Sequence, residues 1–112
     1  MLTRTAIYEG KVKAGHEEAF FTRVREELEP LWAQFPHVSA VRVQRMHSAD
    51  GDARPIAMIL EMDFADQAAL DACLASAARP AAHAKTEEVM AMFEGRFYHI
   101  VSEAHALAIP NS

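Results

Sequence analysis

The segment from about Pro55 to Phe64 constrains the fold more than any other part of the sequence, because its residues alternate between two chemically different sets. Successive side chains of an extended strand point to opposite faces, so each set would line one face of a sheet. The first set is entirely apolar and the second is mixed: Ile56, Met58, Leu60, Met62 and Phe64 against Ala57, Ile59, Glu61 and Asp63. One face therefore belongs to a core. The other is too apolar for bare solvent and too polar for an ordinary core.

Three further segments favour strands, because they are rich in β-branched and aromatic residues. They cover residues 4–13, 38–47 and 96–103. Residues 48–52 separate the second strand from the third and are predicted to form a hairpin turn, with Asp50-Gly51 supplying a positive φ angle.

Three segments favour helices. The first runs from residue 16 to 35, and Pro30 is predicted to kink or restart it because proline lacks the amide donor. Its apolar face has helical spacing and comprises Phe20, Val24, Leu28 and Leu31. The second begins at Asp66 and turns Leu70, Cys73 and Leu74 inward. The third begins beside Pro80, runs to Phe93 and is expected to stop at Gly95.

This order of elements predicts an α+β sandwich, β-α-β-β-α-β, in which helices cover one side of a four-stranded antiparallel sheet. We assign residues 1–106 to a single domain and residues 107–112 to a C-terminal tail. A chain of 112 residues builds one modest core, and 51% apolar residues exceed what that core needs. We therefore expect a homodimer that buries the open sheet face, where Arg42 and Glu61 could pair across adjacent strands.

Charge and apolar patterning exclude several other partners. Eleven basic residues against sixteen acidic ones give a net charge of -5, which disfavours nucleic acid and anionic membranes. No apolar run approaches the ~20 residues of a membrane span, and no signal peptide is recognisable, so we expect a cytoplasmic protein. Cys73 is the only cysteine and is expected to be a small buried hydrophobe.

Three stretches carry a resemblance to a known group of proteins. They are Lys11-Val12-Lys13-Ala14-Gly15-His16-Glu17-Glu18-Ala19-Phe20, Leu60-Glu61-Met62-Asp63-Phe64-Ala65-Asp66 and Val101-Ser102-Glu103. The chain resembles the dimeric α+β barrel superfamily, which includes antibiotic-biosynthesis-monooxygenase-like, stress-responsive barrel and EthD-like proteins. The resemblance implies a ferredoxin-like monomer, a back-to-back dimer, and a pocket between helices and sheet in each subunit.

The resemblance also implies a functional histidine on the last helix after a proline, an element that Pro80-Ala81-Ala82-His83 is similar to, with one extra residue. Cyclase-type relatives carry a helper histidine on strand one, where Ala6 stands here, so that activity is not implied. Tyr8 would point toward the helices and meet a ligand near His83. His99 is a second acid–base candidate, and ligand-binding walls are expected from Trp32, Met58, Leu60 and Met90.

Each of these side chains also has a purely structural interpretation. Histidine side chains have an ordinary pKa of about 6.5, so His83 could take a proton from a phenol or an activated carbon, or it could simply be half exposed at a helix start. Tyr8 could be a core residue with a surface-reaching hydroxyl, Trp32 could be packing at a helix end, and His99 could be a hydrogen-bonded interior residue.

The six histidines do not have the spacing that brings metal ligands together on a strand or helix, so we predict no metal and no cofactor. The leading hypothesis is a homodimer that binds a small apolar or aromatic metabolite, as a cofactor-independent, monooxygenase-like enzyme. One alternative is a non-catalytic ligand-binding or accessory protein of a degradative pathway. The other is a haem-binding or haem-degrading barrel protein.

Overall fold

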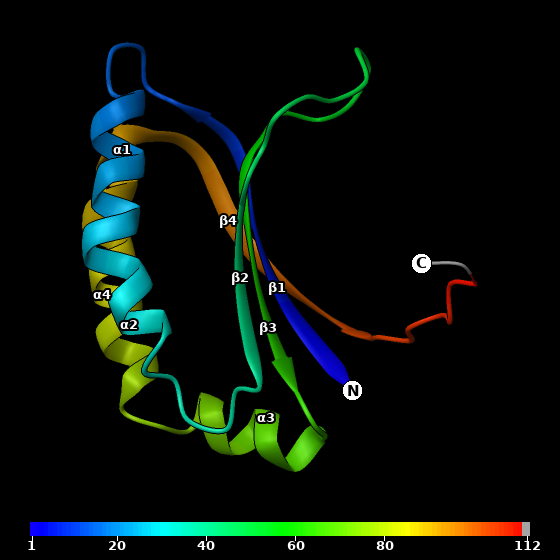
Figure 1. Cartoon of the computed structure of the whole chain (residues 1–112). Helices are drawn as coiled ribbons and strands as arrows, with labels where there is room; N and C mark the ends of the chain where they lie inside the picture. Colours follow the sequence, from blue (N-terminus) through cyan, green and yellow to red (C-terminus); the bar gives the residue numbers. More distant parts are fainter. Residues whose placement is uncertain (111–112) are drawn as a thin grey trace.

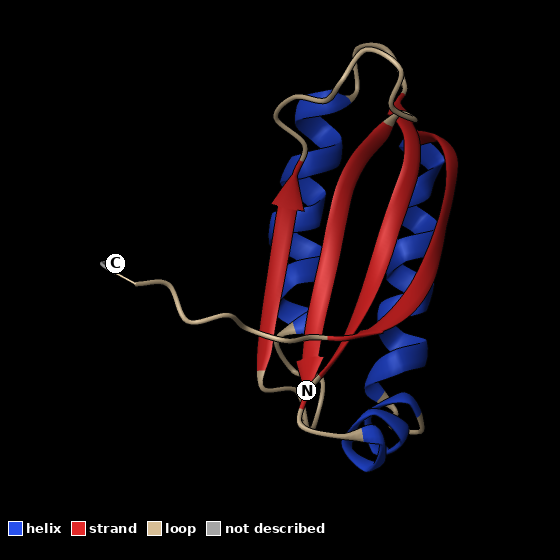
Figure 2. Cartoon of the chain, turned by 90° about the vertical axis from the view of Figure 1, so that its right-hand side faces the viewer, coloured by secondary structure: helices blue, strands red, loops and turns tan. Residues whose placement is uncertain are grey.

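The computed structural model describes residues 1–110 and has one antiparallel sheet with the strand order β2-β3-β1-β4. Helices cover one face of this sheet, the other face carries none, and α3 lies at one end (Figures 1 and 2). The predicted α+β sandwich is therefore confirmed. The elements are β1 (Leu2–Val12), α1 (Glu17–Arg23), the π-helical η1 (Val24–Leu28), α2 (Glu29–Trp32), β2 (Ala40–Arg45), β3 (Ile56–Phe64), α3 (Gln67–Leu74), α4 (Ala78–Val89), the 3-10 turn η2 (Met90–Met92) and β4 (Phe93–Glu103).

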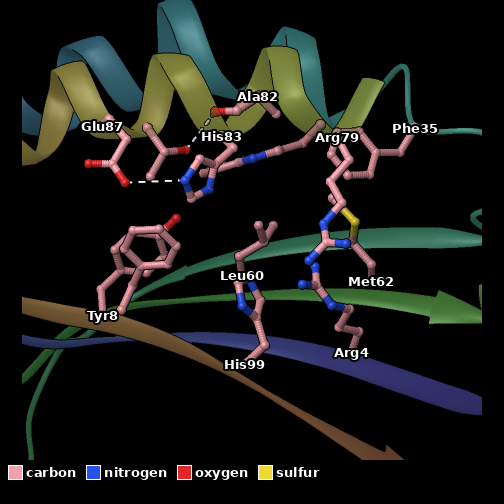
Figure 3. A pocket seen from close by; sticks show the side chains of 13 residues that line it. Arg4, Tyr8, Phe35, Leu60, Met62, Arg79, Ala82, His83, Glu87 and His99 are labelled. Carbon is pink, nitrogen blue, oxygen red and sulfur yellow. Dashed lines mark hydrogen bonds and ion pairs between the residues drawn. The ribbon is translucent and has the colours of Figure 1, made fainter. Parts of the chain in front are cut away.

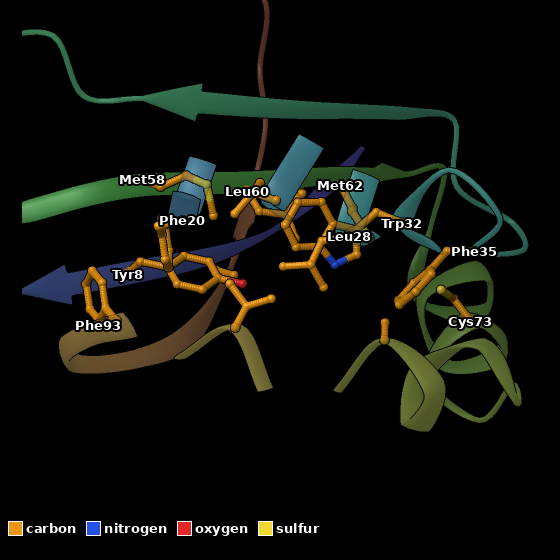
Figure 4. Packing of buried hydrophobic residues seen from close by; sticks show 14 of the residues in the cluster. Tyr8, Phe20, Leu28, Trp32, Phe35, Met58, Leu60, Met62, Cys73 and Phe93 are labelled. Atoms are coloured by element: carbon orange, nitrogen blue, oxygen red, sulfur yellow. The ribbon is translucent and has the colours of Figure 1, made fainter. Parts of the chain in front are cut away.

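The two-residue period of the central strands decides which side chains meet the helices. Tyr8 of β1 is paired with Met58 of β3 on one side and with Phe97 of β4 on the other. Its neighbour on the same face, Ala6, is paired with Leu60 and His99. The core between this face and the helices includes the fully buried side chains of Phe20, Leu28, Met58, Phe64, Cys73 and Val89. Figure 4 shows four of them: Phe20, Leu28, Met58 and Cys73.

The break in the first helix lies before Pro30 and not at it. Residues 24–28 form a turn of π-helix, and α2 restarts with Pro30 in its first turn. The proline ring clashes with the carbonyl group one turn earlier, and proline has no amide hydrogen to donate to that carbonyl. The π-helical turn before it is wider than an α-helical turn and accommodates the clash and the missing hydrogen bond. Val24 and Leu28 stay buried across the break.

The second and third helices begin close to their predicted positions. Asp66 caps α3, because its side chain accepts a hydrogen bond of 2.9 Å from the amide of Ala69. The last helix begins at Ala78, before Pro80, and gives way to η2 at Met90. Proline is tolerated there because it lies within the first turn.

Two expectations about glycine are wrong. Gly95 does not stop the helix; it lies inside β4, directly opposite Gly10 of β1, and both have positive φ angles, 149° and 134°. The helix ends instead in η2, after which Phe93 is already extended. Gly51 is not among the positive-φ residues of the described chain, because residues 46–55 form a longer loop, closed by the amide of Ala53 donating to the carbonyl of Asp50 at 3.0 Å.

The open face of the sheet carries an ion-pair network between β2 and β3. Arg42 donates to Glu61 at 2.9 Å, as expected, and also grips both oxygens of Asp63 at 2.7 and 2.8 Å. Thr3 of β1 donates to the same carboxylate at 2.8 Å. The Arg42 guanidinium and the Thr3 hydroxyl hold the pKa of Asp63 below its ordinary value, although burial opposes them. This network fixes the register of β2 against β3.

After Glu103 the chain leaves the sheet and extends away from it (Figure 2). The predicted tail, 107–112, includes residues 111 and 112, which lie outside the described part of the chain. Within residues 1–110, no helix has the length and apolar character needed to cross a bilayer.

Candidate functional site

A hollow of about 410 Å³ lies between the helix-facing side of the sheet and the helices α2 and α4. Side chains from β1, β3 and β4 form its floor, and side chains from α2 and α4 form its roof (Figure 3). We call it the helix–sheet pocket. It is lined by Arg4, Tyr8, Trp32, Phe35, Leu60, Met62, Arg79, Ala82, His83, Thr86, Glu87, Phe97 and His99.

Tyr8 lies in the floor with only 2% of its surface exposed. Its ring stacks on that of Phe97, with centroids 5.4 Å apart, because the two residues are paired across β1 and β4. Burial raises the pKa of the Tyr8 hydroxyl to about 12, and a hydrogen bond with Thr86 of α4 opposes this only in part. The hydroxyl is therefore neutral at physiological pH, and it can donate a hydrogen bond to a ligand or accept one.

His83 enters the pocket from α4, but it is not enclosed, since its side chain is 60% exposed. Its Nε2 lies 3.2 Å from a carboxylate oxygen of Glu87, one helical turn further along. In the neutral tautomer that carries its proton on Nε2, the nitrogen that faces this carboxylate, Nδ1 is the proton-accepting nitrogen. Sequence reasoning missed Glu87, although its i, i+4 spacing from His83 was a readable signal.

His99 faces the same pocket from β4, where its ring meets the edge of Phe97 with centroids 5.8 Å apart. Burial lowers the pKa of His99 to about 4, and the positive charges of Arg4, Arg79 and His83 lower it further in the same direction. The ring is neutral at physiological pH. It is then a hydrogen-bonding group and only a weak base.

Two arginines in this pocket were not foreseen as site residues. Arg4 reaches up from β1 and Arg79 reaches down from the start of α4, so that their guanidinium groups point toward one another (Figure 3). The signals were present in the sequence, because Arg4 shares strand parity with Tyr8 and Arg79 lies one helical turn before His83.

The structure brings only some of the predicted walls together. Trp32, 3% exposed, and Leu60 line the pocket with Tyr8, His83 and His99. Met58 does not; it is fully buried in the core. Met90 lies in η2, packed against the core away from the pocket lining. Phe35 and Phe97 replace them, so the wall facing a ligand is more aromatic than the sequence suggested.

The arrangement is suited to a flat ring with ionisable substituents. Aromatic faces come from Trp32, Phe35 and Phe97, while titratable groups come from opposite sides of the hollow. Among residues 1–110, no three side chains of His, Cys, Asp or Glu are grouped so that they could hold a metal ion.

No protein-family model matches the sequence, and no curated protein sequence matches it either. Several solved structures, in contrast, are similar to the structure of this chain. An EthD family protein from Bacillus halodurans C-125 has a TM-score of 0.72 at 17% identity, over 94% of this chain and 99% of that one. An antibiotic biosynthesis monooxygenase has a TM-score of 0.59 at 18% identity, over 95% and 100% of the two chains.

A third similar structure is a dimeric protein of unknown function with a ferredoxin-like fold from Bacteroides fragilis NCTC 9343. Its TM-score is 0.64 at 12% identity, over 92% of this chain and 95% of that one. Identities this low establish the architecture alone. The resemblance indicated by the sequence is confirmed at that level: the chain has the ferredoxin-like α+β fold shared by EthD-like and antibiotic-biosynthesis-monooxygenase-like structures.

Proposed function

We propose that each subunit binds a small aromatic metabolite in the helix–sheet pocket and abstracts a proton from it, as in cofactor-independent, monooxygenase-like chemistry. One observation carries the proposal: Tyr8, His83 and His99 converge on a single hollow that also has aromatic walls. Titratable groups gathered in such a hollow are a signature of acid–base sites.

In this proposal the His83–Glu87 pair accepts the proton. Glu87 holds the imidazole through Nε2 and stabilises the imidazolium that forms when Nδ1 takes a proton from a phenol or an activated carbon. Tyr8, whose hydroxyl keeps its proton, hydrogen-bonds an oxygen of the substrate. Trp32 and Phe97 hold the ring. Oxygenation then requires a substrate whose anion transfers electrons to dioxygen directly.

The test is turnover of a panel of phenols and hydroquinones, followed by oxygen uptake and product analysis. His83→Asn removes the proton acceptor, so kcat should fall roughly 10²–10⁴-fold with the fold intact. Glu87→Gln should lower kcat more than it raises KM. The matched control is Glu88→Gln, because Glu88 is exposed on the same helix and pairs with Lys85 at 3.2 Å. Unchanged turnover in His83→Asn would remove His83 from the mechanism.

A homodimer through the open sheet face is part of the same proposal. That face carries Ile7 and Ile59 side by side on β1 and β3, and Ile100 on β4, which is 48% exposed. The similar protein from Bacteroides fragilis is described as dimeric. Ile59→Glu should convert a sedimenting dimer to monomer, whereas Leu107→Glu in the exposed tail should not. A wild-type chain that sediments as a monomer at micromolar concentration would contradict the dimer.

One observation favours the non-catalytic alternative, in which the pocket binds without turnover. His99 has a pKa of about 4 and is a weak base at neutral pH, so only His83 remains as an effective proton acceptor. Ligand binding that persists in His83→Asn, with no product from any substrate in the wild type, would favour this function.

The haem alternative has less support from the described residues. The Nε2 of His83 faces Glu87, and its ring is largely exposed where a haem would require an enclosed apolar slot. A Soret shift on adding haem that disappears in His83→Asn would favour haem binding.

A further inference from the structure

The two arginines of the helix–sheet pocket line a hollow without an acidic partner. Three other arginines of the chain have one: Arg23 pairs with Glu27, Arg42 with Asp63 and Glu61, and Arg96 with Glu9. Neither Arg4 nor Arg79 takes part in an ion pair or a side-chain hydrogen bond within residues 1–110. The chain has more acidic than basic residues, so the lack of an acid beside this pair is a local feature.

The two guanidinium groups also act on each other. Burial lowers the pKa of Arg4, and the positive charge of Arg79 lowers it further. Like charges that face one another at the edge of a hollow cost free energy unless an anion lies between them. The only carboxylate lining the pocket belongs to Glu87, and it contacts His83.

The positive field extends through the pocket. Burial is the main cause of the low pKa of His99, and the positive charges of Arg4, on the neighbouring strand, and of Arg79 and His83, on α4, lower it further. Three separate elements, β1, β4 and α4, therefore present cationic or neutral groups to the ligand space, with one acid at its rim. Such a field attracts and orients an anion.

We infer that the ligand of the helix–sheet pocket is an aromatic carboxylate whose carboxylate group is held between Arg4 and Arg79. This inference rests on the proposed function and specifies its substrate class. In Figure 3 the two arginines lie at one end of the pocket and Tyr8 lies at the other, with His83 and His99 between them. A ring bound by its carboxylate would thus present its far substituent to the proton-handling side chains.

A carboxylate fits this site better than a phosphate ester does. Two guanidinium groups offer planar forks that match the two oxygens of a carboxylate, as Arg42 already does with Asp63 on the other face. The sequence offers no glycine-rich loop to supply backbone amides to a phosphate group. A pocket of about 410 Å³ is of the size that holds a single-ring ligand.

Binding is measured by the fluorescence of Trp32, the only tryptophan of the chain, which lines the pocket. The probes are 4-hydroxybenzoate, 4-hydroxyphenylacetate and 4-hydroxycinnamate, each beside its uncharged methyl ester, with phenyl phosphate as the competing oxyanion. Arg4→Met and Arg79→Met remove the charge but keep an apolar stem. Arg54→Met is the control, because Arg54 is exposed in the loop before β3.

We expect at least one acid to bind about tenfold or more tightly than its ester and than phenyl phosphate. Each pocket variant should lose about tenfold or more of that affinity and leave ester binding unchanged, and Arg54→Met should change neither. Acid binding should also raise the pKa of His99, measured by NMR, because the carboxylate offsets the charges of Arg4 and Arg79 while Tyr8, His83 and Glu87 stay in place.

The outcomes separate this inference from the proposed function. Equal affinity for acid and ester, with no effect of Arg4→Met and Arg79→Met, would overturn the inference of a carboxylate ligand. The proposal that the pocket binds an aromatic ligand would be unaffected. Tighter binding of phenyl phosphate would overturn it in favour of a phosphate ester. If the esters and the acids all fail to bind at millimolar concentration, both proposals fall. Arg4→Lys and Arg79→Lys, which keep the charge, should recover part of the lost affinity if the methionine variants are folded.

Discussion

The contact between β1 and β4 at Gly10 and Gly95 supports the register that places Tyr8 opposite Phe97 in the pocket floor. Gly10 has a φ of 134°, which L side chains rarely adopt. A Cβ atom added there would lie 2.9 Å from the Cα of Gly95 and would collide with the carbonyl oxygen of Glu94. Backbone strain of this kind costs about 1–3 kcal/mol, and the collision with backbone, which cannot rotate away, adds to it.

Gly10→Ala should therefore lower the free energy of unfolding by at least about 2 kcal/mol. For a chain of 112 residues, about 2 kcal/mol corresponds to a fall in Tm of roughly 8 °C. Urea denaturation and calorimetry measure both quantities. Gly51→Ala is the control, because a Cβ there meets no heavy atom within 4 Å and φ is not positive, so its effect should stay within about 0.5 kcal/mol. If Gly10→Ala unfolds at the same urea concentration as Gly51→Ala, the strand contact described here is incorrect.

Three further predictions follow from buried groups. The pKa of His99 is about 4, below its unfolded value of about 6.5, so the unfolded chain binds a proton at a higher pH than the folded chain does. The free energy of unfolding should therefore fall as the pH drops from about 6.5 to 4, and His99→Asn should reduce that loss. The pKa of Tyr8 is about 12, above its unfolded value of about 10, so stability should fall as pH rises between these values, and absorbance titration of Tyr8→Phe should lack the late-ionising phenol. Cys73 is fully buried and burial raises the pKa of its thiol, so a thiol reagent should label it only after unfolding; rapid labelling of the folded chain would contradict this packing.

The alternation of residues along the strands was enough to predict the sheet and its two faces. Alternation placed Leu60 on the core face, the resemblance placed Tyr8 toward the helices, and the structure has both residues there. The alternation of side chains identifies the face of a strand on which a residue lies, but not the position along the strand at which a pocket forms. Met58 and Leu60 share a face, yet Met58 is fully buried in the core, and of the two only Leu60 lines the pocket.

Helix ends were harder to predict, because several local signals compete there. Gly95 resembles a glycine that ends a helix, but its positive φ occurs inside β4, where it is paired with Gly10 of β1. Gly10 is far away in the sequence, so local signals could not indicate this pairing. The facing arginines illustrate the same limit. Arg4 and Arg79 are 75 positions apart in the printed sequence, so their meeting follows from the packing of α4 over β1.

The most direct test of the account is an NMR titration of the isotope-labelled chain with 4-hydroxybenzoate and its methyl ester. If the helix–sheet pocket is the binding site, the largest shift changes should come from Trp32, Thr86, Phe97 and His99, and residues of the open sheet face should not change. Shift changes confined to the open face or spread over the surface, with those four residues unaffected, would contradict it.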